Sequence, residues 1–150
     1  MSEKHTLAYS YEIYIATPAK KVWQALVDGD LTKHYVYGTK FESKLKKGAV
    51  YAYVGEGDFH VVDGVILEVV PENKLTMTWS AHYDSSVAGD RPSRVSYELS
   101  EVDPTLTRLH VRHDDFDGAT ATYKGSVEGW PRIISSLKTL LETGTALPGF

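Results

Sequence analysis

The sequence predicts a single α+β domain over residues 1–150, built from an antiparallel sheet and a long C-terminal helix. Two observations predict this class. Segments with alternating apolar and polar residues are separated by short turns, which is typical of an antiparallel meander. The last apolar pattern in the chain instead has the three-and-four spacing of a helix that covers a surface with one face. The expected order is one strand, two short helices, six strands and the long helix, with no linker or repeat between them.

The long helix is predicted from Gly129 to the residue before Gly144. Pro131 suits its first turn, where the missing N–H would be unpaired anyway, and Gly144 suits the left-handed position that follows a helix. Its apolar stripe consists of Trp130, Ile133, Ile134, Leu137, Leu140 and Leu141. A helix with one broad apolar stripe needs a surface to cover, so we expect it to close one side of a sheet-lined cavity.

The other elements follow from period and turn chemistry. Strict alternation predicts the first strand at 7–15, and Thr17 and Pro18 predict the N-cap and first position of a helix that ends near Val27. A second, shorter helix is expected at 31–37, and a polar loop at 83–91. The six further strands are expected at 40–45, 49–54, 60–70, 75–82, 94–99 and 108–113.

Composition restricts the function classes. The net charge is −4 with acids and bases interspersed, so no basic face for nucleic acid is expected. There are no cysteines, no apolar run of about 20 residues that could span a membrane and no signal-like N-terminus, so we expect a cytoplasmic protein. The 10 tyrosines and 3 tryptophans are the informative excess, because aromatic groups with polar tips can line a pocket as well as a core.

Three motifs carry a family resemblance. They are IATPAKKVWQAL at 15–26, GVILEVVP at 64–71 followed by Lys74, Leu75 and Trp79, and Gly129-Trp130 running into the leucines before Gly144. In order and spacing the chain resembles the helix-grip superfamily of START, SRPBCC and Bet v-like proteins. Within it, the chain is similar to the branch named after the activator of heat-shock protein ATPase (AHSA-type). The resemblance implies a curved seven-stranded antiparallel sheet around the C-terminal helix, with a cavity between them. Relatives bind hydrophobic small molecules, cyclise polyketides or stimulate a chaperone ATPase.

Strand parity and this implied fold define a candidate ligand-binding set. Residues on the inward face of strands are expected to line the cavity together with the helix stripe and the segment leading into it. The short second helix is expected to contribute tyrosines at the gate. The full set is Tyr9, Tyr11, Tyr35, Tyr37, Met77, Trp79, Tyr97, His113, Phe116 and Trp130. A filled core is the alternative for the same residues.

His113 is the candidate catalytic residue. It shares a strand face with Leu109 and Val111, and a buried imidazole needs a hydrogen-bond partner, for which Asp114, Asp115 or a pocket tyrosine is available. It is either a ligand-orienting or general-base histidine or a core histidine with its bonds satisfied.

His60 and Asp63 could form an acid–base pair if a bulge at Asp63-Gly64 turned the carboxylate inward; otherwise they start a solvated strand. His110 and His113 have opposite strand parity, and no other histidine spacing fits a metal site. We therefore expect no metal and no cofactor.

The preferred function is binding of a hydrophobic, aromatic or lipid-like small molecule. One alternative is a cyclase- or hydrolase-type enzyme with His113 as base and a tyrosine as acid. A second is a chaperone-activator-like interaction protein. Whether a reaction is catalysed is left open, with binding alone favoured, and so is a homodimer formed through an exposed edge strand or apolar patch.

Overall fold

The computed structural model describes residues 7–149 and confirms the predicted fold class. Seven strands form one antiparallel sheet in the order β1-β7-β6-β5-β4-β3-β2. The strands are β1 Tyr9–Ile15, β2 Lys40–Ser43, β3 Val50–Val54, β4 His60–Val70, β5 Lys74–Ala81, β6 Ser93–Asp103 and β7 Leu106–Asp114. The helices are α1 Ala19–Val27, α2 Gly29–Thr32, α3 Ser85–Ala88 and α4 Ala121–Thr143, with a 3-10 turn at Glu56–Asp58.

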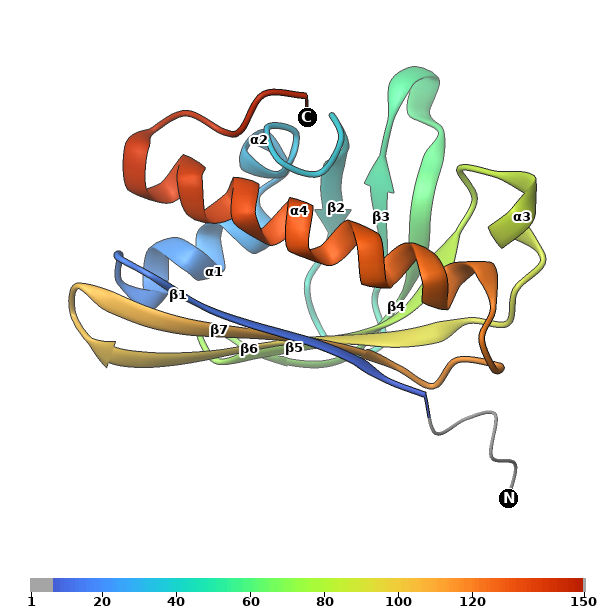
Figure 1. The fold of residues 1–150 in the computed structure, drawn as a ribbon, viewed down its shortest axis with the longest axis horizontal. Coiled ribbons are helices and arrows are strands. Elements are labelled where there is room, and N and C mark those ends of the chain that lie inside the picture. The colour runs from blue at the N-terminus through green and yellow to red at the C-terminus, as the bar shows by residue number, and fades with distance from the viewer. Residues whose placement is uncertain (1–6, 150) are drawn as a thin grey trace.

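The sheet curves around α4, which lies across its concave side (Figure 1). Helices α1 and α2 lie together at one end of the molecule, and α3 lies near the N-terminal end of α4. Side chains alternate along the strands as predicted, because successive residues of a strand point to opposite faces. On β5, β6 and β7 the inward residues are almost completely buried and form the core with α1 and α4: Leu75, Met77, Val95, Tyr97, Leu99, Leu109 and Val111.

The C-terminal helix begins earlier than the sequence pattern predicted. It starts at Ala121, and the Thr120 side chain accepts a hydrogen bond from the Tyr123 N–H at 3.2 Å, which makes Thr120 the N-cap. Pro131 therefore lies inside the helix and leaves one carbonyl without its helical donor. The end was predicted correctly, since Gly144 adopts the left-handed conformation at φ 88°.

The short helices also differ from the predictions. Pro18 is the N-cap of α1 rather than its first residue, and the Thr17 carbonyl is used to accept a hydrogen bond from the Thr107 hydroxyl. The second helix is only Gly29–Thr32, followed by turns through the predicted 31–37 range. The 83–91 segment contains α3, whose N-terminus is capped by Asp84. Local hydrogen bonds of aspartate side chains decide both short helices, and periodicity cannot detect elements of four residues.

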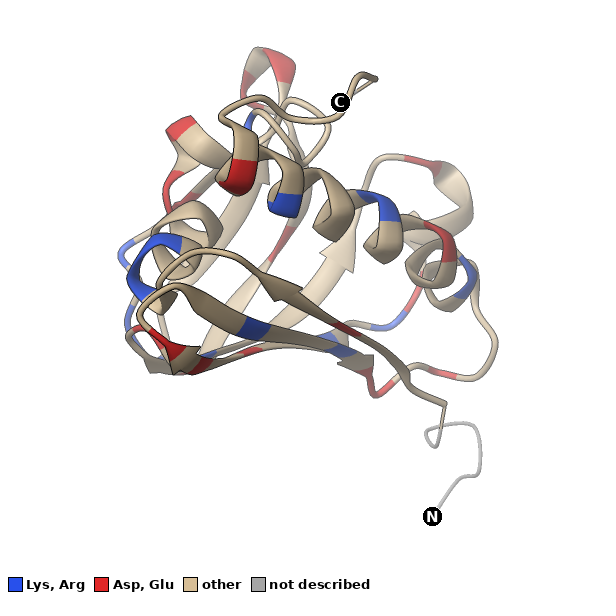
Figure 2. Ribbon diagram, turned by 60° about the vertical axis from the view of Figure 1, so that its left-hand side comes forward, with Lys and Arg blue, Asp and Glu red and all other residues tan. Residues whose placement is uncertain are grey.

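Charged residues of both signs are interspersed over the strands and along α4 (Figure 2), as the composition predicted. Among the described residues no helix is long and apolar enough to cross a membrane.

Candidate functional site: an aromatic cavity under helix α4

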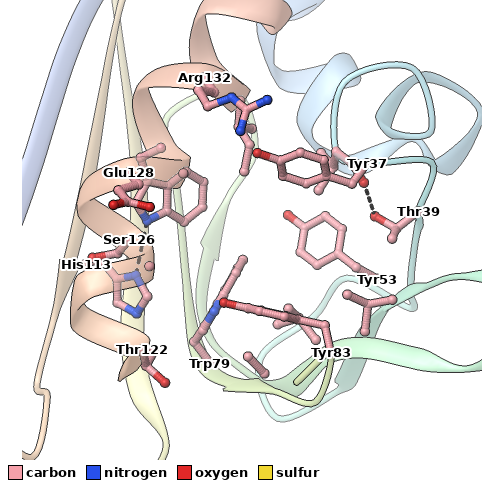
Figure 3. A pocket seen from close by; sticks show the side chains of 18 of the residues that line it. Tyr37, Thr39, Tyr53, Trp79, Tyr83, His113, Thr122, Ser126, Glu128 and Arg132 are labelled. Carbon is pink, nitrogen blue, oxygen red and sulfur yellow. Dashed lines mark hydrogen bonds between the residues drawn. The ribbon is translucent and has the colours of Figure 1, made fainter. Parts of the chain in front are cut away.

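A cavity of about 520 Å³ lies between the N-terminal half of α4 and the inner face of the sheet. Strands β3, β4, β5, β6 and β7 each contribute to its wall, together with the segment between α2 and β2 and the segment before α3. Figure 3 shows the side chains of α4 on one side of the cavity and Tyr53, Trp79 and Tyr83 across from them. Its size lies within the range of small-molecule sites, about 300–1,000 Å³.

Two glycines of α4 make room for the cavity. Gly125 and Gly129 are four residues apart, so they lie on the same face of the helix, and both line the cavity. A Cβ atom on Gly129 would meet nothing within 4 Å, and one on Gly125 would lie 3.1 Å from the Tyr83 hydroxyl. The helix backbone itself therefore forms part of the wall.

Aromatic rings form most of the opposite wall. The Trp79 ring centroid lies 5.7 Å from that of Tyr53 and 5.3 Å from that of Trp130. Trp130 in turn meets Tyr97 edge-on at 5.9 Å. Tilted and edge-on contacts of this kind are favourable and hold the rings in fixed orientations. The wall is thus mainly apolar.

A pair of tyrosine hydroxyls supplies polarity deep in the cavity. The hydroxyls of Tyr53 and Tyr97 are 3.0 Å apart, and both residues are buried. Burial raises the pKa of Tyr53 to about 12 and that of Tyr97 well above its ordinary value. Both phenols are therefore neutral at physiological pH.

One end of the cavity is bordered by Tyr37 and Arg132 (Figure 3). Tyr37 has a positive φ of 50° and its side chain is about half exposed, at 47%. The Arg132 guanidinium carbon lies 5.9 Å from the centre of the Tyr37 ring, which is a cation–π distance. Tyr83, exposed at 56%, borders the cavity elsewhere.

His113 lies on the cavity wall but is held by the protein through both ring nitrogens. Trp130 donates its indole N–H to Nδ1 at 3.1 Å, so Nδ1 is the unprotonated nitrogen. Nε2 therefore carries the proton and donates it to the Ser93 hydroxyl at 2.7 Å. Burial lowers the pKa of His113 to about 3. No lone pair is left for a substrate proton, and so weak a base is mismatched to neutral pH. These contacts favour the second of the two alternatives, a core histidine whose hydrogen bonds are satisfied.

The expected carboxylate partners of His113 are engaged elsewhere. Asp114 accepts two hydrogen bonds from Arg94, at 2.9 and 3.0 Å, and one from Arg112 at 2.9 Å. These guanidinium contacts hold the pKa of Asp114 below its ordinary value, even though burial by itself would raise it. Asp115 binds Arg91. The partners of His113 are instead Ser93 and Trp130, which local sequence could not have indicated because they come from β6 and α4.

The structure brings half of the predicted ligand-binding set together on the cavity wall: Tyr37, Trp79, Tyr97, His113 and Trp130. Tyr35 and Met77 are buried in the core outside the cavity, and the Tyr35 hydroxyl donates to the Ala25 carbonyl. Phe116 packs on His113, with ring centroids 4.5 Å apart. Tyr9 and Tyr11 are partly buried on β1 and do not line the cavity.

Tyr53 and Tyr83 line the cavity and were not predicted to do so. Strand parity could have placed Tyr53 on the inner face of the sheet. However, Tyr51 lies on the same face of the same strand, so parity does not tell which of the two tyrosines lines the cavity. Tyr51 is equally buried, and its hydroxyl donates a hydrogen bond to the Thr78 carbonyl instead of lining the cavity. Tyr83 lies in the segment that was expected to be a polar loop, and no sequence signal marks it.

His60 and Asp63 do form a pair, at 3.1 Å, and His82 binds the other carboxylate oxygen of Asp63 at 2.8 Å. The hydrogen bonds from both histidines lower the pKa of Asp63, while burial opposes this. No bulge turns Asp63 inward: it pairs with Ser80, next to the buried Val62–Ala81 pair. The cluster is therefore on the outer face of the sheet. Within residues 7–149 no group of three or more potential ligands could hold a metal ion.

With the fold and cavity described, comparison with known proteins decides the family. The family model described as activator of Hsp90 ATPase homolog 1-like protein matches residues 16–142. The chain belongs to this family.

Similar solved structures share the fold of this chain. Protein MLL2253 from Mesorhizobium loti is 27% identical, with a TM-score of 0.74 over 91% of this chain and 97% of that one. The Aha1 dimer from Colwellia psychrerythraea is 19% identical, with a TM-score of 0.73 over 93% of this chain and 98% of that one. The HSP90 activator PFC0360w from Plasmodium falciparum is 16% identical, with a TM-score of 0.71 over 91% and 96%. At such identities the last two show a shared fold alone. No curated protein sequence matches the chain.

Proposed function

We propose that this member of the activator family binds a hydrophobic, planar small molecule in the cavity under α4. The observation that supports the proposal most directly is the cavity itself, about 520 Å³ between side chains that are mainly apolar and aromatic. A cavity of this size accommodates a molecule of several fused rings. Fold alone would not choose this function, since the same architecture carries several.

The two helical glycines support the proposal further. Glycine in a helix interior costs roughly 0.5–1 kcal/mol relative to alanine. Gly129 accepts this cost although a side chain there would meet nothing within 4 Å. Space kept open at the expense of helix stability is what a binding site requires and a packed core does not.

Filling this space tests the proposal. Gly129→Leu is expected to weaken binding of the neutral, apolar fluorescent probe N-phenyl-1-naphthylamine at least tenfold, because the new side chain enters the cavity. Binding is measured by probe fluorescence and by quenching of tryptophan emission, since Trp79 and Trp130 are on the wall.

The matched control is Val127→Leu, which enlarges a side chain of the same helix that is 40% exposed and outside the cavity. It should bind the probe as the unmodified protein does. Equal affinity for the unmodified protein and Gly129→Leu would show that the probe binds elsewhere, and the proposal would be withdrawn if no apolar probe bound at all.

An enzymatic role with His113 as base gains no support from the site, since both nitrogens are engaged and the pKa is lowered to about 3. Turnover by other residues would need another base, for which the described part of the cavity wall offers the carboxylate of Glu128.

A second candidate function is contact with a heat-shock ATPase. It is favoured by the family description and by exposed apolar side chains on the outer face of the sheet, where Val50 pairs with Val65 and Leu67 follows. Stimulation of chaperone ATPase activity that is lost in Val65→Lys would support it, and no stimulation would exclude it. A homodimer and a cytoplasmic location stay predictions; sedimentation of the purified chain would test the first.

A further inference from the structure

The two hydroxyl groups of Tyr53 and Tyr97 carry two protons, but the hydrogen bond between them uses only one. The two residues come from β3 and β6, line the cavity and are only 2% and 3% exposed. Each neutral phenol carries one proton, and the single contact between the oxygens, at 3.0 Å, uses one of the two. Neither hydroxyl bonds to any other residue in the 7–149 range, so the second proton is available to the cavity.

The other buried hydroxyls of the cavity wall have already donated their protons to the protein. Thr39 donates to the Val36 carbonyl at 2.7 Å, and Ser126 donates to the Tyr123 carbonyl at 2.7 Å. Thr122 donates to the Asp90 carboxylate at 2.6 Å. Towards a ligand these three oxygens can only accept. The tyrosine pair therefore differs from them in offering a donor.

The indole N–H of Trp79 also donates to no other residue in the described part of the chain. However, Trp79 is only partly buried, so water can satisfy it. A donor in an apolar enclosure lacks that alternative, and leaving it unpaired is costly. The ligand atom nearest the tyrosine pair is therefore expected to be an acceptor.

We propose that the cavity selects planar aromatic ketones, whose carbonyl oxygen accepts the spare hydroxyl proton of the Tyr53–Tyr97 pair. This inference rests on the proposed function and adds the ligand class. A neutral carbonyl is favoured over a carboxylate, because a buried anion would need a charged partner at this depth. Arg132 of the cavity wall lies over the Tyr37 ring at one end of the cavity, whereas the rings of Tyr53 and Tyr97 contact Trp79 and Trp130.

The test compares fluorenone with fluorene, which differ by the carbonyl group alone. The dissociation constants of both are measured by tryptophan quenching for the unmodified protein and for Tyr53→Phe/Tyr97→Phe. The ratio of the two constants is expected to shift about tenfold towards fluorene in the double variant, since a net hydrogen bond contributes about that factor. Comparing ratios removes the difference in hydration between the two probes.

The single variants provide a sharper expectation. Tyr53→Phe and Tyr97→Phe each retain one hydroxyl whose proton is no longer used within the pair, so each should keep most of the preference for fluorenone. Tyr51→Phe is the matched control, because Tyr51 is a buried tyrosine of the same strand that donates to the Thr78 carbonyl and does not line the cavity. It should leave the ratio unchanged.

A second measurement does not depend on the variants folding. The carbonyl stretching band of fluorenone bound to the unmodified protein should lie at lower frequency than in hexane, as hydrogen bonding requires. An unshifted band, or a double variant with the unmodified ratio, would overturn the ketone inference while leaving the binding function intact. If neither fluorene nor fluorenone bound, both the inference and the proposed function would be rejected.

Discussion

Replacing Gly64 by alanine is expected to reduce the free energy of unfolding by about 3 kcal/mol, at the upper end for added bulk in a packed site. A Cβ atom at Gly64 would overlap the backbone carbonyl oxygen of Thr78 on the neighbouring strand. Thr78 cannot retreat, because its carbonyl accepts the Tyr51 hydroxyl and its side-chain oxygen accepts the Val65 N–H at 2.9 Å. The strands β4 and β5 would have to separate at this point.

Urea unfolding of Gly64→Ala and of the unmodified protein measures this effect. Gly129→Ala is the matched control, since its Cβ would meet nothing within 4 Å and it lies in a helix interior. We expect it to stabilise the protein by roughly 0.5–1 kcal/mol. If Gly64→Ala unfolded at the same urea concentration as the unmodified protein, β4 and β5 would not be in the close contact described above.

Gly64 also shows what the sequence could and could not predict. It opens one of the three motifs that indicated the family, so its presence was noticed. Its physical role depends on the approach of Thr78, 14 positions further along the chain. Strand parity, in contrast, is a local property, and it placed Trp79, Tyr97 and His113 on the inner face correctly.

Parity could not say where along that face the cavity would be. Tyr9 and Tyr11 lie on β1, which α4 contacts directly: Lys138 binds the Tyr14 carbonyl, and Glu142 accepts the Ala16 N–H. Beneath the C-terminal half of α4 the space is filled by the apolar side chains of the helix: Ile134, Leu137, Leu140 and Leu141. The cavity opens only under the N-terminal half, where Gly125 and Gly129 replace large side chains.

The same residues explain why the start of α4 was missed. The inward positions of its first nine residues are Thr122, Gly125, Ser126 and Gly129, which are small or polar. Without apolar side chains at three-and-four spacing there is no amphipathic pattern to detect. The features that create the cavity therefore removed the signal that would have predicted the helix around it.

Acidification from pH 7 to pH 4.5 is expected to reduce the free energy of unfolding by about 2–3 kcal/mol through His113 alone. Its pKa is lowered from the ordinary 6.5 to about 3 by burial in the folded protein. Between these two values the unfolded chain binds a proton that the folded protein does not, so stability falls as the pH falls below 6.5. Above 6.5 both states are neutral and the contribution is complete.

Carboxylates act in a separate pH range. The pKa values of Asp63, Asp114 and Glu142 are lowered in the folded protein by their hydrogen-bond partners. Their stabilisation is complete above the ordinary carboxyl pKa, about 4 to 4.5, and is lost as the pH falls from there through the lowered pKa of the folded state. Between pH 6.5 and 5 the loss of stability therefore comes mainly from histidine, and at pH 4.5 the comparison with a His113 variant removes the carboxylate contribution.

The measurement is urea unfolding at pH 7, 6, 5 and 4.5 for the unmodified protein and for His113→Gln. An amide in this position can still accept the Trp130 N–H and donate to Ser93, but it cannot be protonated in this range. The variant should be less stable at pH 7 and should lose about 2–3 kcal/mol less on acidification, because the remaining histidines are common to both proteins. Parallel stability curves would mean that His113 is protonated in the folded protein near its ordinary pKa. In that case its hydrogen bonds with Trp130 and Ser93 would not hold as described, and His113 would regain its place as a candidate base.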